Sequence, residues 1–86
     1  MEISFSPTFI KMLKTFPPEL QEETIEKIEA FKNPRSHTSL KVHKLKGRLK
    51  GRYSFSVNYH IRIVFTYLKP QSAYLLAIGD HDIYRD

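Results

Sequence analysis

The first six residues alternate between polar and apolar side chains. Ile3 and Phe5 lie on one face of this run, which predicts a short strand with a single buried side. Ser6 and Pro7 follow as the N-cap and first-turn pair of a helix. The next apolar residues recur at the spacing of an amphipathic helix and are Phe9, Met12, Leu13 and Phe16. We therefore expect a strand followed directly by a short helix.

A second amphipathic helix is predicted between Pro18 and Phe31. Pro17 and Pro18 end the first helix and begin the second, and Asn33 with Pro34 ends it. Its apolar face lies opposite a glutamate-rich face and consists of Leu20, Thr24, Ile25, Ile28 and Phe31. The two helices are expected to form a hairpin whose apolar faces belong to the core.

Strict alternation after residue 52 predicts three strands. Their apolar positions are Tyr53, Phe55 and Val57, then Tyr59, Ile61, Ile63, Phe65 and Tyr67, and finally Tyr74, Leu76 and Ile78. Asn58 supplies the turn chemistry for a tight hairpin between the first two, and residues 69–72 supply the next turn. We expect an α+β fold in the order β-α-α-β-β-β. Its antiparallel sheet, joined by the N-terminal strand, packs one face on the helical hairpin.

The opposite face of this sheet is predicted to be polar and cationic. Side chains two positions apart share a face of a strand. This face therefore carries Arg52, Ser54, Ser56, His60 and Arg62, with His81 and Tyr84 arriving from the end of the last strand. An ordinary solvated face is the simpler explanation, because antiparallel sheets are often wet on one side. The absence of carboxylates makes this face a candidate site instead.

Length and composition limit the classes of protein that the chain can represent. With 86 residues, 41% of them hydrophobic, it is expected to form one small globular domain with its own core. It contains no cysteine, which excludes disulfides, thiolate metal sites and cysteine nucleophiles and fits a cytoplasmic location. It lacks a signal-peptide pattern and any apolar run long enough to cross a membrane, so we expect no membrane partner.

The cationic residues are concentrated in the middle of the chain. Residues 32–52 hold eight lysines and arginines and no acidic residue, within a total net charge of +5. Such a cluster is typical of a surface that binds phosphates, since each bound cation releases counterions from a polyanion. The alternative is a solvated loop that keeps the protein soluble. We expect residues 35–50 to form a long loop that leads into the next strand. The expected RNA-binding residues lie in this loop and just after it and are Lys41, Lys44, Lys46, Arg48, Lys50 and Arg52.

Several kinds of catalytic site are excluded by the motifs that the chain lacks. It has no glycine-rich phosphate loop, HExxH zinc motif or GxSxG nucleophile elbow. Its four histidines do not have ligand spacing, so neither a metal nor another cofactor is expected. Metal-free cleavage of RNA needs a cation for the phosphate, a base for the 2′-hydroxyl and an acid for the leaving oxygen. These side-chain types are available in Arg62, His81 and Tyr84.

Two segments carry a resemblance to a known family. The first is the run Leu45, Gly47, Leu49, Gly51, Tyr53 and Ser54, which leads into the strand with Arg62, and the second is the ending IGDHDIYR. In this order they resemble the RelE/ParE superfamily of toxins from bacterial type II toxin–antitoxin systems. The resemblance covers residues 1–86 as a single RelE-like domain. It implies a ribosome-dependent, metal-independent endonuclease that cleaves messenger RNA and so inhibits translation.

The resemblance also implies roles for individual residues. Arg62 matches the strand arginine that contacts the scissile phosphate, His81 the C-terminal histidine, and Tyr84 a terminal aromatic residue. His43 matches a histidine that YafQ-like members carry before a Lys-Leu pair. His60 stands near their aspartate. The candidate catalytic residues are therefore Arg62, His81, Tyr84, His43 and His60, with the acid and the base left unassigned.

The expected partners are a cognate acidic antitoxin, the ribosome and messenger RNA. An acidic antitoxin segment would neutralise the cations of residues 32–52 and compete with RNA for them. We expect a monomer alone and a hetero-oligomer with the antitoxin. Two alternatives remain: a ParE-like inhibitor of DNA gyrase without enzymatic activity, and a non-catalytic RNA- or ribosome-binding module. The latter would need exposed aromatic side chains for stacking, whereas the alternation assigns the aromatic residues to the core.

Overall fold

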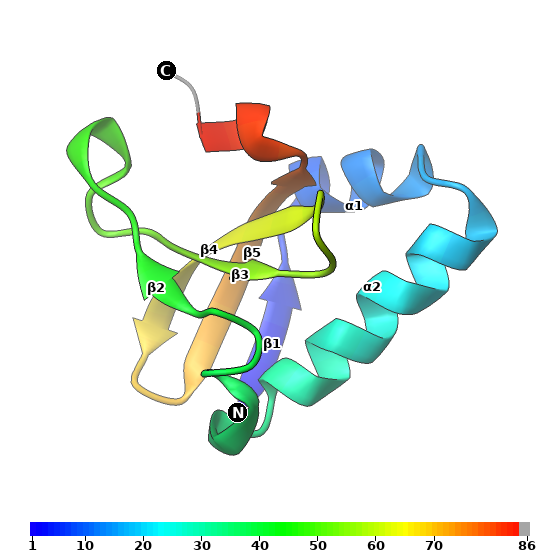
Figure 1. The fold of residues 1–86 in the computed structure, drawn as a ribbon. Helices are drawn as coiled ribbons and strands as arrows, with labels where there is room; N and C mark the ends of the chain where they lie inside the picture. Colours follow the sequence, from blue (N-terminus) through cyan, green and yellow to red (C-terminus); the bar gives the residue numbers. More distant parts are fainter. Residues whose placement is uncertain (85–86) are drawn as a thin grey trace.

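The computed structural model describes the backbone of residues 1–84 and every side chain in that range except those of His81 and Tyr84. Two helices precede most of the sheet (Figure 1). The strands and helices are β1 (Glu2–Phe5), α1 (Pro7–Lys14), α2 (Pro18–Phe31), β2 (His43–Lys44), β3 (Tyr53–Ser56), β4 (Arg62–Lys69) and β5 (Ser72–Gly79). Three short 3₁₀ turns are η1 (Pro34–Ser36), η2 (Gly47–Leu49) and η3 (His81–Tyr84). No helix within residues 1–84 is long and apolar enough to span a membrane.

The strands form one sheet in the order β1-β5-β4-β3-β2. The expected α+β class and the meander of β3, β4 and β5 are confirmed, since these neighbours pair antiparallel. The N-terminal strand joins this sheet as expected, but the sheet is not antiparallel at that edge, because β1 runs parallel to β5. Strand direction depends on how the intervening chain returns to the sheet, and the alternation within β1 carries no information about it.

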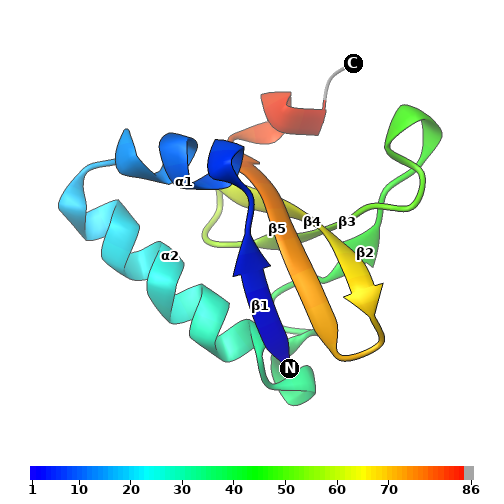
Figure 2. The ribbon, with the colours of Figure 1, turned by 180° about the vertical axis from the view of Figure 1, so that it is seen from behind.

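Residues 35–50 contain more regular structure than the long loop that we expected there. It includes the short strand β2, which pairs antiparallel with β3, and the turn η2. Gly47 and Gly51 have φ angles of +69° and +87°, which glycine adopts without steric penalty. The two glycines of the LxGxLxG pattern therefore shape the arm between β2 and β3. We call residues 41–52 the basic arm, which stands out at the edge of the sheet (Figures 1 and 2).

Ser6 joins the first helix to the centre of β5. Its Oγ accepts a hydrogen bond from Phe9 N at 2.9 Å, as the predicted N-cap, and its hydroxyl donates to Leu76 O at 2.9 Å. Leu76 is the extra residue of a β-bulge, because Leu75 pairs with Phe65 and Ala77 with Val64. The Ser6 hydroxyl thus provides a hydrogen bond for the Leu76 carbonyl, because the bulge leaves Leu76 without a partner in β4.

The bulge also changes which residues of β5 reach the core. The buried apolar residues of β5 are Ala73, Leu75 and Ile78. The predicted position Ile78 is thus confirmed, and the predicted positions Tyr74 and Leu76 are wrong. A β-bulge inserts one residue and so shifts the alternation by one position. Pure period-two reasoning is therefore correct only beyond the bulge.

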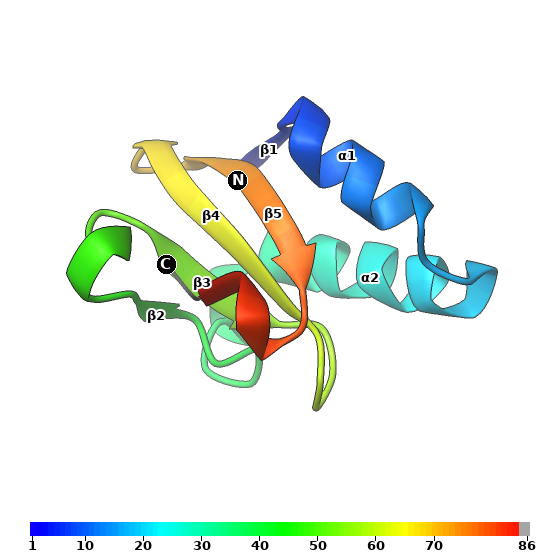
Figure 3. The ribbon, with the colours of Figure 1, turned by 90° about the horizontal axis from the view of Figure 1, so that it is seen from above.

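Both helices cover one face of the sheet (Figure 3). From the predicted stripe of α2, Thr24, Ile28 and Phe31 are buried, but Ile25 is 53% exposed, so its assignment to the core is wrong. Successive residues of a helix are rotated by about 100°, and Ile25 therefore lies at the edge of the stripe. Thr24 compensates for its polar side chain by donating to Leu20 O at 2.8 Å.

Phe31 is the centre of the aromatic core. Its ring stacks on Phe55 with centroids 4.3 Å apart and on His37 with centroids 4.9 Å apart. The edge of Phe65 meets it at 4.8 Å. At the margin of this cluster, burial raises the pKa of the Tyr67 hydroxyl, and the neighbouring Tyr53 raises that pKa further.

The second face of the sheet is less wet than predicted. Ser54 is fully buried and Val64 is 3% exposed, so the expectation of an exposed Ser54 is wrong. The turn η3 lies against β4 and β5. A Cβ on Gly79 would lie 2.5 Å from Cγ2 of Ile83, which indicates that η3 packs closely on the end of β5. The C-terminal turn thus covers part of a face that we expected to be open.

Lys41 has an unusual backbone conformation. Among residues 1–84 it is the single non-glycine residue with a positive φ, at 59°. A residue with a Cβ adopts this left-handed region at a cost of roughly 1–2 kcal/mol. The preceding Leu40 is buried, and its carbonyl accepts from Ser56 N at 2.8 Å, which holds the segment in place.

We predict that Phe31→Ala lowers the free energy of unfolding by about 3–5 kcal/mol, because it removes a fully buried ring from the centre of the core. Ile25→Ala is the control on the same helix, and its loss should be within about 0.5–1 kcal/mol because the side chain is largely exposed. Urea denaturation followed by circular dichroism measures both. Equal losses in the two variants would contradict the proposed core.

We also predict that Lys41→Gly raises the free energy of unfolding by up to about 1 kcal/mol. Glycine removes the steric cost of the left-handed conformation, and this gain exceeds the extra backbone entropy that glycine loses on folding. Lys44→Gly, in β2, should instead destabilise the protein by about 0.5–1 kcal/mol. Urea midpoints of the two variants provide the test. A Lys41→Gly variant less stable than Lys44→Gly would show that the backbone at residue 41 is unstrained.

Candidate functional site

Arg62 is the first residue of β4, which is the central strand of the sheet. It pairs with Ser56 of β3 on one side and with Gly79 of β5 on the other. Its Nη1 donates to Asn58 O at 2.6 Å and to Ile61 O at 3.2 Å. Both hydrogen bonds of Arg62 with the described residues come from Nη1. A guanidinium carries five N–H donors in total. Nε and Nη2 therefore retain donors for an anion.

The segment between β3 and β4 is a longer loop than the predicted tight hairpin. Asn58 Oδ1 accepts from His60 N and from Ile61 N, both at 2.8 Å, so its role as the turn residue is confirmed. Its Nδ2 donates to Glu23 Oε1 of α2 at 2.9 Å. Because this side chain satisfies backbone groups that would otherwise enter the ladder, β4 begins at Arg62. The prediction that Tyr59 lies in a strand with its ring in the core is wrong: the residue is in the loop and 86% exposed.

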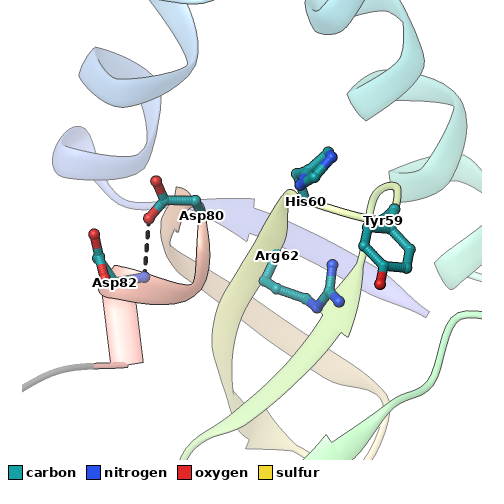
Figure 4. Close-up of a pocket in the computed structure, with 5 residues that line it drawn as sticks. All are labelled: Tyr59, His60, Arg62, Asp80 and Asp82. Atoms are coloured by element: carbon teal, nitrogen blue, oxygen red, sulfur yellow. Dashed lines mark hydrogen bonds between the residues drawn. The ribbon is translucent and has the colours of Figure 1, made fainter.

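One hollow lies beside Arg62 (Figure 4). It has a volume of about 520 Å³ and is lined by Tyr59, His60, Arg62, Asp80 and Asp82. Asp80 Oδ1 accepts from Asp82 N at 2.9 Å, which shapes the start of η3. We call this the Asp80 hollow. It combines one guanidinium with two carboxylates and an imidazole, so the sequence-based expectation of a face without carboxylates is wrong here.

The structure brings some of the predicted catalytic residues together. His60 lines the Asp80 hollow with Arg62, although it lies in the loop and not in the predicted strand. His81 and Tyr84 belong to η3, which follows the end of β5 where Gly79 pairs with Arg62. Their side chains lie outside the described residues.

His43 lies on the same face of the sheet but farther away. It pairs with Ser54, one row along the strands from the row that contains Arg62, and two strands across. Strand spacings separate the two Cα atoms by roughly 12 Å. His43 Nδ1 donates to Lys41 O at 2.8 Å, so Nε2 is the basic nitrogen of the neutral ring.

The predicted RNA-binding residues all lie in the basic arm, and all six are exposed. They are Lys41, Lys44, Lys46, Arg48, Lys50 and Arg52. The arm is closed by hydrogen bonds from Leu45 N to Arg52 O at 2.9 Å and from Lys50 N to Gly47 O at 3.0 Å. Its cations are thus held on a folded hairpin.

A second hollow lies on the other side of Arg62 and was not predicted from the sequence. It has a volume of about 290 Å³, and its cations are Lys27, Lys41 and Arg62. Tyr59 also lines it. We call it the Lys27 hollow. Lys27 stands among the glutamates of α2 in the sequence, so its place at this hollow becomes visible only through the contact of the helix with the β3–β4 loop.

Comparisons with known proteins identify the fold. No protein-family model matches the chain, and no curated protein does so either. Among solved structures, a chain of the YoeB–YefM complex from Staphylococcus aureus is 24% identical, with 94% of this chain and 97% of that chain covered and a TM-score of 0.73. A chain of the RelBE2 toxin–antitoxin complex from Mycobacterium tuberculosis is 16% identical, with coverages of 93% and 96% and a TM-score of 0.77.

A third similar structure extends over nearly the whole chain. YafQ from Escherichia coli is 15% identical, with 99% of this chain and 98% of that chain covered and a TM-score of 0.71. All three structures carry the names of toxin–antitoxin proteins, and the low identities make this a likeness of fold. The resemblance inferred from the sequence is thus matched in three dimensions: the chain has the fold of the RelE, YoeB and YafQ toxins.

Proposed function

We propose that this protein is the toxin of a type II toxin–antitoxin pair and cleaves messenger RNA on the ribosome without a metal ion. The observation that supports it most is Arg62, whose guanidinium is held at a hollow on the face of a RelE-like sheet. An arm of exposed cations lies farther along the same sheet. Such an arm provides the electrostatic attraction that RNA or ribosome binding requires. We also infer an acidic antitoxin as partner, because similar structures are complexes of toxins with antitoxins.

In the proposed reaction, the 2′-oxygen of one nucleotide attacks the adjacent phosphorus, and the bond to the 5′-oxygen of the next nucleotide breaks. A base takes the proton of the 2′-hydroxyl, and an acid gives a proton to the leaving 5′-oxygen. Arg62 would stabilise the charge that develops on the phosphate oxygens. Holding Nη1 on two carbonyls orients the guanidinium before substrate arrives.

The acid and the base are drawn from His60, His81, Tyr84 and His43. His60 is favoured by its place in the Asp80 hollow. His81 and Tyr84 are favoured by the position of η3 at the end of β5. His43 would act on a substrate that lies across the sheet, because its distance from Arg62 exceeds hydrogen-bond reach.

A non-catalytic RNA-binding module is the second candidate function. Such a module needs exposed aromatic side chains, whereas the strand alternation had assigned the aromatic residues to the core. The exposure of Tyr59 removes that objection. Both functions predict RNA binding, and only cleavage distinguishes them.

Arg62→Ala should reduce the cleavage rate by about 10²–10³-fold, the usual effect of losing one donor to a developing oxyanion. Arg62→Lys keeps the charge without the guanidinium fork and should restore only part of the rate. Primer extension on messenger RNA incubated with ribosomes measures cleavage, and urea denaturation monitors the fold. Full activity in a folded Arg62→Ala variant would exclude the proposed role, and no cleavage by the wild-type protein would favour the binding module.

Replacing Lys44, Lys46 and Lys50 by alanine should weaken ribosome binding and flatten its dependence on salt. Each lost phosphate contact lowers the log–log slope by about 0.7–0.9. The matched control replaces Lys11, Lys14 and Lys69, three lysines outside the basic arm. Sedimentation with ribosomes at several salt concentrations gives both slopes. Equal slopes for the two triple variants would mean that the basic arm does not contact phosphates.

A further inference from the structure

The Lys27 hollow differs in charge from the Asp80 hollow on the other side of Arg62. Its cations come from three separate elements: Lys27 from α2, Lys41 from the turn before β2, and Arg62 from β4. The described residues that line it include no acidic side chain, whereas Asp80 and Asp82 line the other hollow. Glu23, the nearest acidic residue that the structure connects to this hollow, has its Oε1 bonded to Asn58 Nδ2 and does not line it. Three cations in a lining without a carboxylate favour an anionic ligand.

An exposed aromatic ring stands at this hollow. Tyr59 is 86% exposed, so burial in the core does not account for its ring. The loop that carries it is braced, because Asn58 caps two of its amides and is itself bonded to Glu23 of α2. A ring held in this way beside cations is the combination that binds single-stranded nucleic acid, with a base on the ring and phosphates on the cations.

The backbone at Lys41 is a further indication. Its φ of 59° would favour glycine, yet the position is occupied by a lysine that lines the hollow. Backbone strain of this kind persists where the surrounding structure enforces it and is concentrated at functional sites. The neighbouring hydrogen bond from Ser56 N to Leu40 O provides that enforcement.

We propose that the Lys27 hollow binds one nucleotide of single-stranded RNA, next to the phosphate that Arg62 contacts. The base stacks on Tyr59, and Lys27 with Lys41 contacts the phosphate of that nucleotide. The inference rests on the proposed function, since it takes RNA as the substrate, and it assigns binding roles to Lys27 and Tyr59. Because every base has a π-face, the stack positions the RNA and does not select its sequence.

A tryptophan at position 59 tests the stack directly. The protein has no tryptophan, so Tyr59→Trp introduces a single fluorescent reporter. The probe is a short 2′-O-methyl oligoribonucleotide, which lacks the attacking hydroxyl and cannot be cleaved. We expect saturable quenching of this tryptophan. Leu68→Trp, at an exposed position near the far end of β4, is the control and should not be quenched.

The phosphate contact is tested in the Tyr59→Trp background. Adding Lys27→Ala should weaken oligonucleotide binding and lower its salt slope by about 0.7, the value for one contact with a single strand. Lys11→Ala, on α1 and outside both hollows, should leave binding and slope unchanged. Equal effects of the two lysine substitutions would overturn the phosphate contact.

Activity gives an independent readout of the stack. Tyr59→Ala should weaken oligonucleotide binding about 5- to 150-fold, the range that corresponds to loss of one base stack, and reduce cleavage at limiting messenger RNA. Tyr59→Phe should restore both, because stacking needs the ring and not the hydroxyl.

The two hypotheses fail in different ways. No quenching of the tryptophan at position 59, together with Arg62-dependent cleavage by the wild-type protein, would overturn the nucleotide site and leave the proposed function intact. Quenching without any cleavage would overturn the proposed function and leave the nucleotide site.

Discussion

The stacking of Phe31 between Phe55 and His37 is the contact on which the rest of the molecule depends. It fixes the last turn of α2 to the sheet, and Ile28 continues the buried stripe along the helix. Once that stripe is buried, the helical period determines which residues flank it. Glu23, one residue before the buried Thr24, then meets the β3–β4 loop, and Lys27, one turn later, lines the hollow beside it. The aromatic core thereby sets the position of the helix face that carries Glu23 and Lys27.

The β3–β4 loop links the packed helix α2 to Arg62 and so fixes the geometry of the site. Asn58 connects the loop to α2 and orders the two carbonyls that hold the Arg62 guanidinium. The same loop presents Tyr59 to solvent. The surroundings of Arg62 are asymmetric, with lysines on one side and carboxylates of the η3 segment on the other. We infer that a polyanion would approach from the lysine side, since the carboxylates repel phosphate on the other.

The similarity to YoeB, RelE and YafQ structures at 15–24% identity has a physical basis. The fold needs apolar residues at the period of each element, a cap at Ser6 and glycines where the basic arm requires a positive φ. These demands leave most surface positions free to vary. Fold and function are therefore separate questions, and the proposed function rests on the side chains that surround Arg62.

The sequence by itself determined the elements with local causes. Ser6 and Pro7 begin α1, the glycines shape the basic arm, and the alternation in β4 places Arg62 opposite the core face, because caps, φ preferences and strand period act over a few residues. Only the tertiary structure decided the parallel pairing of β1, the bulge at Leu76 and the burial of Ser54. It also decided the contact of Lys27 with the β3–β4 loop. These features arise where segments distant in sequence meet, and hydrogen bonding or close packing between them overrides the local pattern.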